Sequence, residues 1–167
     1  QRQRRNVGLA LYLVAQLVGG SILLLLFLLP AFFEEGALGG LCIAAVLAFP
    51  AGAIYLTVPR LLDRYDPEPW YALIGCLLWG GIAACGFSAV INSAVGALGG
   101  EHGDVLSAVV SAPLVEEFFK GVGVFGVFYF LRRDFDGVVD GIIYSVFIAL
   151  GFATVENVVY YAKATME

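Results

Sequence analysis

Residues 7–33 read VGLALYLVAQLVGGSILLLLFLLPAFF, and this stretch contains no Asp, Glu, Lys or Arg. A helix needs about 20 apolar residues to cross the ~30 Å hydrocarbon core of a bilayer. The stretch is long enough for that crossing, and it is longer than the apolar region of a cleaved signal peptide. It therefore predicts a transmembrane helix.

Similar apolar runs follow along the whole chain. The 167 residues are 60% hydrophobic and 14% charged, whereas soluble domains have about 45–50% and about 25%. The composition excludes a cytosolic enzyme, a nucleic-acid binder and a disulfide-rich secreted module. The sequence predicts an all-α polytopic transmembrane helix bundle, one membrane domain over residues 1–167 with no soluble domain. We expect at least five spans, at about residues 7–33, 36–58, 70–98, 105–131 and 141–162.

Basic residues lie on alternate connections between these spans. They precede the first span, separate the second from the third, and separate the fourth from the fifth: Arg2, Arg4, Arg5, Arg60, Arg64, Arg132 and Arg133. The other two loops, residues 34–36 and 99–104, contain no Lys or Arg. Lys and Arg are enriched in cytoplasmic loops, so we expect a cytoplasmic N-terminus and residue 167 on the outer side.

The ends of the chain suggest a longer protein. Met166 is the only methionine, so the sequence does not begin at an initiator residue, and it ends soon after the last apolar run. We therefore expect these residues to be the N-terminal part of a longer membrane protein.

Two predicted spans contain charged residues, which are costly in a bilayer and need a reason. The fourth carries Glu116, Glu117 and Lys120, and the fifth carries Glu156 followed by Asn157. Both Glu116 and Glu156 are fifteen residues from the cytoplasmic end of their span, or ~22 Å along a helix. The two carboxyl groups should therefore lie at one depth, in the outer half of the bilayer, and could share a water-filled pocket.

The spacing on the fourth span separates two roles. Glu116 and Glu117 are four and three residues from Lys120, so either can pair with the lysine. Only one charge is neutralised in this way. The other glutamate is available as a general base beside Glu156. An ion-pair cluster that only holds helices together, or a pathway for protons or cations, would also use such residues.

Four short motifs follow one another in the second half of the chain. Residues 116–120 match EExxK, residues 136–144 match DGxxDGxxY, and residues 151–157 match GFAxxEN. Asp66 to Trp70 is similar to an EPEPW-like loop. Together, over about residues 60 to 162, they resemble the PrsW intramembrane proteases, which belong with the type II CAAX prenyl endopeptidases and the bacterial Abi proteins.

The resemblance implies an endopeptidase in a bacterial plasma membrane that cleaves a membrane-anchored protein, such as an anti-sigma factor. It implies that Glu116 activates water. Glu156 would polarise that water, and Glu117 and Lys120 would position Glu116 and balance its charge. Asn157 would donate a hydrogen bond to the substrate or intermediate. The expected partners are the substrate and the lipid bilayer, with no nucleic acid.

The resemblance leaves the metal open. Zinc is one option, with Glu116 and Glu156 as ligands, and a water attack driven by glutamate alone is the other. The superfamily has a further motif built on a histidine in a later span, so we expect part of the site beyond residue 167. The only histidine, His102, should be a solvated loop residue.

A non-enzymatic function remains the alternative: a proton-coupled carrier or a membrane scaffold with the same fold. A carrier needs a polar path to both faces of the membrane. The third span adds only Ser88 and Asn92, and the cytoplasmic halves of the last two spans add little beyond Tyr144 and Ser145. The sequence therefore favours a pocket that opens outward over a continuous path.

Overall fold

The computed structural model describes residues 2–34, 36–62, 64, 67–132, 135 and 137–166. The side chains of Arg2, Arg4, Arg5, Leu62 and Met166 lie outside this description. So do Asp66, Asp136 and Arg133, which the sequence analysis placed in two motifs and in a basic loop. All regular structure in the described part of the chain is helical, as predicted.

The chain folds as a bundle of long helical runs. The first run is α1 (Arg2–Leu23), a π-helical segment (Leu24–Leu28) and α2 (Leu29–Ala31). The second is α3 (Ala37–Tyr55) with α4 (Thr57–Leu62), and the third is α5 (Trp70–Leu78), a π-helical segment (Trp79–Ala84) and α6 (Cys85–Leu98). A 3-10 turn (Gly100–His102), α7 (Gly103–Leu106), a π-helical segment (Ser107–Ser111) and α8 (Ala112–Phe130) form the fourth, and α9 (Val138–Met166) is the fifth.

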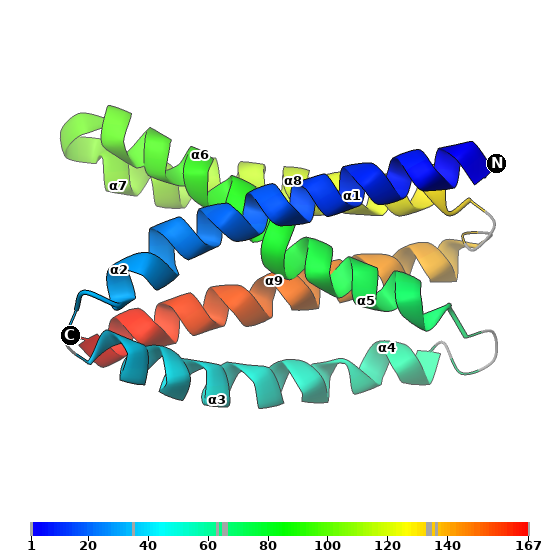
Figure 1. Ribbon diagram of the computed structural model, residues 1–167, viewed down its shortest axis with the longest axis horizontal. Helices are drawn as coiled ribbons and strands as arrows, with labels where there is room; N and C mark the ends of the chain where they lie inside the picture. The colour runs from blue at the N-terminus through cyan, green and yellow to red at the C-terminus, as the bar shows by residue number, and fades with distance from the viewer. Residues whose placement is uncertain are drawn as a thin grey trace.

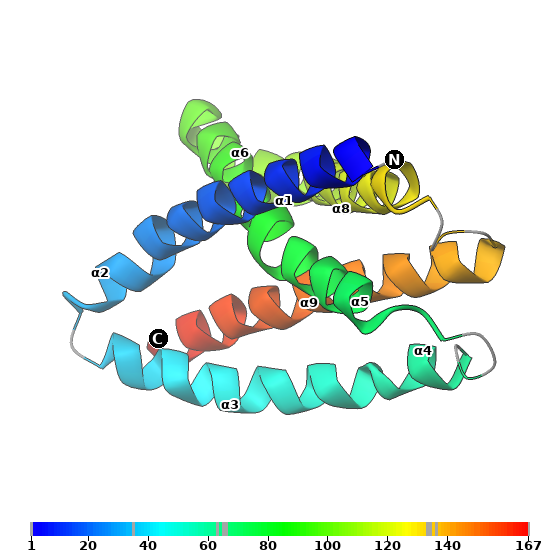
Figure 2. The ribbon, with the colours of Figure 1, turned by 45° about the vertical axis from the view of Figure 1, so that its right-hand side comes forward.

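Successive runs are antiparallel, so the connections alternate between two ends of the bundle (Figure 1). The N-terminus and the α4–α5 and α8–α9 connections lie at one end, and the C-terminus lies at the other. Helix α9 occupies the middle, with α3 on one side and α1 and α8 on the other, and α5–α6 crosses the bundle obliquely (Figure 2). The loops that alternate in basic residues therefore also alternate in space.

Four helical runs in the described chain are long and apolar enough to cross a membrane: Asn6–Ala31, Ala37–Leu61, Trp70–Leu98 and Val138–Thr165. This is one fewer than the five expected. The run that does not qualify is α7–α8, which carries the charged residues Asp104, Glu116, Glu117 and Lys120. It still extends along the bundle beside α6 and α9 (Figure 1).

Close backbone contact sets the crossing between the third run and α9. A Cβ atom at Gly80 would overlap the carbonyl oxygen of Ile148, and one at Gly151 would overlap the carbonyl oxygen of Leu77. Small residues at such crossings let helices approach closely in membranes. Glycine at these positions therefore fixes the height at which α9, and with it Glu156, meets the rest of the bundle.

Two of the π-helical segments precede a proline. Leu24–Leu28 comes just before Pro30, and Ser107–Ser111 comes just before Pro113. Proline has no N–H to donate to the carbonyl four residues earlier, and a π-helical turn is a common local adjustment in a helix, frequent at functional sites. The second segment matters for function, because it ends at Ser111, whose side chain faces α6.

Candidate active site

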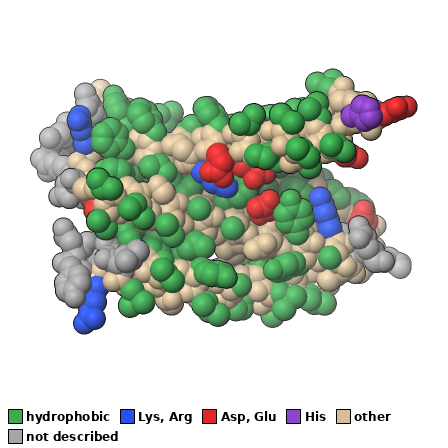
Figure 3. Space-filling model, turned by 180° about the vertical axis from the view of Figure 1, so that it is seen from behind, with side chains coloured by type: hydrophobic (Ala, Val, Ile, Leu, Met, Phe, Trp, Pro, Cys, Tyr) green, Lys and Arg blue, Asp and Glu red, His purple; other side chains and the backbone are tan. Residues whose placement is uncertain are grey.

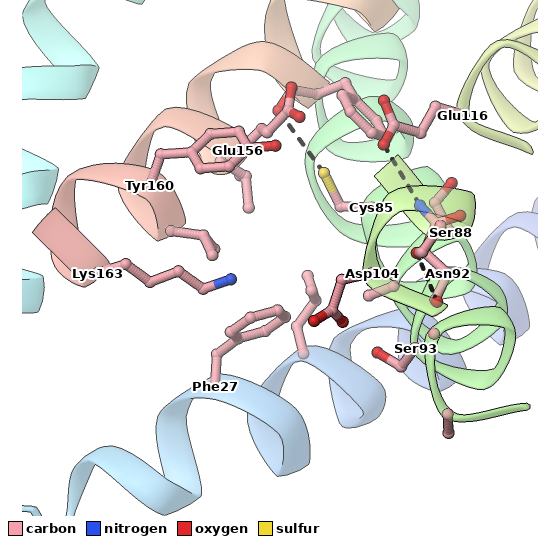
Figure 4. A pocket seen from close by; sticks show the side chains of 18 residues that line it. Phe27, Cys85, Ser88, Asn92, Ser93, Asp104, Glu116, Glu156, Tyr160 and Lys163 are labelled. Atoms are coloured by element: carbon pink, nitrogen blue, oxygen red, sulfur yellow. Dashed lines mark hydrogen bonds between the residues drawn. The ribbon is translucent and has the colours of Figure 1, made fainter. Parts of the chain in front are cut away.

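A cavity of about 410 Å³ lies between the end of the first run, α6, the start of the fourth run and the C-terminal half of α9. Figure 4 shows its lining side chains. Glu116 and Glu156 both line it, as do these other polar or ionisable residues: Cys85, Ser88, Asn92, Ser93, Asp104, Ser107, Tyr160 and Lys163. The structure thus brings the two carboxyl groups, forty residues apart in sequence, to a single cavity.

Glu116 projects from α8 towards α6. Its Oε1 lies 3.5 Å from Nδ2 of Asn92, and Oδ1 of Asn92 accepts a 2.8 Å hydrogen bond from the Ser111 hydroxyl. Ser107 also donates a 2.7 Å hydrogen bond to the Asn92 backbone carbonyl. Because an amide oxygen only accepts hydrogen bonds, the serine contact turns the NH₂ group of Asn92 towards Glu116.

Glu156 enters the cavity from α9, and Tyr160, one turn later, lies beside it (Figure 4). The Glu116 and Glu156 side chains reach the cavity from α8 and α9. Both side chains are partly buried. Two carboxylates facing a shared, partly enclosed space can hold and orient a water molecule between them.

Lys120 pairs with Glu117, not Glu116. Its Nζ lies 2.7 Å from Glu117 Oε1 and 4.2 Å from the centre of the Phe152 ring. Neither partner lines the cavity, whereas Phe152 does, so the aromatic ring lies between the ion pair and the cavity. The Glu117 side chain is 72% exposed. Figure 3 shows charged side chains near the middle of a face that is otherwise mostly hydrophobic.

Two further predicted residues lie outside the cavity. Asn157 is partly buried on α9 but is not among the lining residues. His102 is exposed in the turn before α7 and does not line the cavity either, which agrees with a loop position. Of the predicted site residues, Glu116 and Glu156 line the cavity, whereas Glu117 and Lys120 lie behind Phe152. Asn157 follows Glu156 in the sequence but does not line the cavity.

The donor set does not complete a zinc site. Catalytic zinc ions take three protein ligands, and Glu116 and Glu156 supply two. Within the described residues no three His, Cys, Asp or Glu side chains lie close enough together to hold a metal ion. A metal bound by Glu116 and Glu156 would need a third donor from elsewhere.

The sequence analysis named Ser88 and Asn92 as polar residues of the third span, but it did not assign them or the other side chains around the two glutamates to the site. Asn92 was visible as an isolated amide in an apolar run, and such residues usually face the interior of a bundle. Ser107 and Ser111 are four residues apart and so share a helix face. The signal for Asp104, Tyr160 and Lys163 was weaker, because polar residues near the end of a span are normally solvated.

The other two motifs meet at the opposite end of α9. The Tyr144 hydroxyl donates a hydrogen bond to Oε2 of Glu68, in the segment before α5. Tyr144 is fully buried, and it precedes Glu156 by twelve residues, or ~18 Å of helix. This contact ties the loop to α9 far from the cavity.

Comparison with known proteins agrees with the motifs. Residues 68–167 match the family described as PrsW family intramembrane metalloprotease. The chain is 34% identical over 109 residues to Protease PrsW of Geobacillus kaustophilus, covering 65% of this chain and 48% of that protein. It is 37% identical over 103 residues to Protease PrsW of Clostridioides difficile, covering 60% and 43%. The chain thus spans less than half the length of these relatives. No solved structure matches it.

Proposed function

This chain belongs to the PrsW family of intramembrane metalloproteases, and from that premise we propose that it hydrolyses a peptide bond of a membrane-anchored protein in the cavity between α6, α8 and α9. The observation that carries the proposal is that Glu116 and Glu156 line the same cavity. A single-pass anti-sigma factor is the proposed kind of substrate. The wider relation to CAAX prenyl endopeptidases and Abi proteins is proposed from the motifs alone.

The chemistry that these residues can perform is attack by an activated water. Glu116 takes a proton from a water molecule as the water oxygen adds to the carbonyl carbon of the substrate. Glu156 accepts a hydrogen bond from the other O–H of that water, which stays on the oxygen, and so orients the attacking lone pair. Glu116 then returns the proton to the leaving amine, and the C–N bond breaks. No step here uses a metal, because the described residues lack a third ligand.

Neighbouring residues keep Glu116 available for this role. Asn92, oriented by Ser111, holds the carboxylate from the α6 side. Because Lys120 is paired with Glu117, no direct ion pair neutralises Glu116. Asn157 stays a proposed donor to the substrate, although it does not line the cavity.

The topology in the membrane is part of the proposal. We place α7–α8 across the bilayer as a fifth span, supported by its course beside α6 and α9 (Figure 1). Its charged side chains then face the cavity or pair with each other. With the basic connections in the cytoplasm, the N-terminus is cytoplasmic and the cavity lies towards the outer face of the plasma membrane.

The test compares cleavage of a co-reconstituted single-pass anti-sigma factor in liposomes by wild type, Glu116→Gln and Glu101→Gln. Glu101 is exposed in the turn before α7 and does not line the cavity, so its variant is the matched control. We expect Glu116→Gln to lose about 10²–10⁴-fold in rate, with the control unchanged. Equal cleavage by wild type and Glu116→Gln would remove Glu116 from the chemistry. Full function in Glu116→Gln combined with Glu156→Gln would favour a purely structural cluster.

A further inference from the structure

The cavity has a second set of charges away from the two glutamates. Asp104 enters it from α7 and Lys163 enters it from the last turn of α9, on different walls (Figure 4). The proposed hydrolysis uses neither residue. Among the described residues, neither takes part in an ion pair. Two exposed charges thus flank the space through which a bound peptide would leave the glutamates.

Lys163 is the one cationic side chain among the described residues that line the cavity. The ionisable acids on the lining are Asp104, Glu116 and Glu156, and Lys120 lies behind Phe152. An acidic side chain of a bound peptide would meet like charges at Asp104, Glu116 and Glu156 and an opposite charge at Lys163. A charged group next to an opposite charge in a partly enclosed site forms a strong, directional contact.

The distance between Glu156 and Lys163 along α9 predicts which residue of a bound substrate would lie beside Lys163. Lys163 follows Glu156 by seven residues, or ~10 Å of helix. An extended peptide advances about 3.3 Å per residue, so about three residues cover this length. Asp104 is held on the far wall, where its Oδ1 would lie 3.9 Å from a Cβ added at Gly96 of α6. It would repel an acid placed against that wall.

Resting on the proposed function, we propose that Lys163 is a specificity-determining residue. It selects substrates that carry an acidic side chain about three residues from the scissile bond, on the side towards the C-terminal end of α9. Asp104 disfavours acids on the opposite wall and so sets which way the acidic side chain points. The substrate class is therefore a single-pass protein with an acidic residue just beyond the cleaved bond, in the outer flank of its membrane span.

The test uses three series of synthetic single-pass peptides. Each has a Leu-Ala membrane span and an Ala-Gly-Ser outer flank, through which a single Glu, Gln or Lys is scanned. Binding of the fluorescent peptides is measured by anisotropy in nanodiscs on the Glu116→Gln protein, alone or combined with Lys163→Gln, Lys163→Glu or Glu101→Lys. The Glu101→Lys variant reverses a charge at the same end of the bundle without touching the cavity.

We expect Glu peptides to bind about tenfold more tightly than Gln peptides at one or two neighbouring positions. Lys163→Gln should abolish this preference, Lys163→Glu should transfer it to the Lys peptides, and Glu101→Lys should leave it unchanged. Equal binding of the Glu and Gln series would overturn the inference. So would an equal loss for all three series in Lys163→Glu, or a dependence on anionic lipid instead of peptide charge, since both indicate a headgroup or structural role for Lys163.

The cleavage arm uses the protein with Glu116 intact and maps the products by mass spectrometry. The cut should move along the flank with the Glu, keeping a distance of about three residues. A cut at a constant position, whatever the position of Glu, would contradict the inference. Because the binding arm needs no cleavage, charge selectivity without cleavage would count against the proposed function only, and cleavage without charge selectivity would count against Lys163 only.

Discussion

The side-chain amide of Asn92 on α6 lies 3.5 Å from the Glu116 carboxylate on α8, and its oxygen accepts a hydrogen bond from Ser111, five residues before Glu116. The asparagine is therefore held by the same helical run whose glutamate it contacts. The π-helical segment before Pro113 ends at Ser111 and carries the hydroxyl that makes this bond. The π-helical segment thus contributes directly to the position of Asn92 and Glu116 at the cavity.

Replacing Asn92 with Leu tests this arrangement. Loss of the amide should let the Glu116 side chain move, and displacements of about 1 Å can cost about 10²-fold in rate. We expect kcat to fall by about 10–100-fold with little change in KM, because the substrate contacts remain. Ser111→Ala should give a smaller loss in the same parameter.

Ser145→Ala is the control for that series, because it removes a similar hydroxyl, one that donates a hydrogen bond to the Gly141 carbonyl within α9. A rise in KM with kcat unchanged in Asn92→Leu would show that the asparagine binds substrate and does not position Glu116.

Lys120 and Glu117 should respond unequally to substitution. Lys120 is 19% exposed and lies against Phe152, whereas Glu117 is 72% exposed. Lys120→Met should lower kcat/KM by more than about tenfold, because it alters the wall behind the cavity and removes the cation that lies over the Phe152 ring. Glu117→Gln should change it by less than about threefold. Steady-state kinetics on both variants decide this, and a loss in Glu117→Gln as large as that in Glu116→Gln would identify Glu117 as the base.

Gly80→Ala should destabilise the bundle. The added Cβ would overlap the backbone of Ile148 at the crossing of the third run and α9, and overpacking of this kind costs about 1–3 kcal/mol. Gly75→Ala on the same run is the matched control, because a Cβ there meets nothing within 4 Å. Thermal unfolding in detergent should give a lower Tm for the first variant only, and equal Tm values would show that the crossing is looser than the structure indicates.

Tyr144→Phe should lower the stability of the protein without changing peptide binding, because Tyr144 and the cavity lie at opposite ends of α9. It removes the hydroxyl that donates to Glu68, so the free energy of unfolding should fall by about 1 kcal/mol. Peptide binding in the cavity should be unaffected, because Glu156 is ~18 Å further along the helix. Unfolding and binding measured on one preparation would show this, whereas lost cleavage at an unchanged Tm would mean that the loop acts on the chemistry.

The sequence predicted the helical bundle and the meeting of Glu116 and Glu156, because both depend on regular quantities. A helix rises by a constant amount per residue, so two carboxyls equally far from neighbouring ends lie at one level. It predicted five spans, whereas four described runs are long and apolar enough to cross a membrane, since the charges on α8 count against that run when composition alone is scored. It could not choose the partner of Lys120, because three- and four-residue spacings are equally compatible with a pair.

By itself the sequence determined the fold class, the order and approximate bounds of the helical runs, and the positions of the ionisable groups along those runs, since each follows from the local composition of one segment. Only the tertiary structure decided that Glu116 faces Asn92, that Lys120 pairs with Glu117 behind Phe152, and that Asp104 and Lys163 reach the same cavity. These contacts depend on how helices cross and rotate. The crossing and rotation of the helices are set by backbone contacts at a few glycines and by the π-helical segments before prolines. The periodicity of a single helix does not reveal either feature.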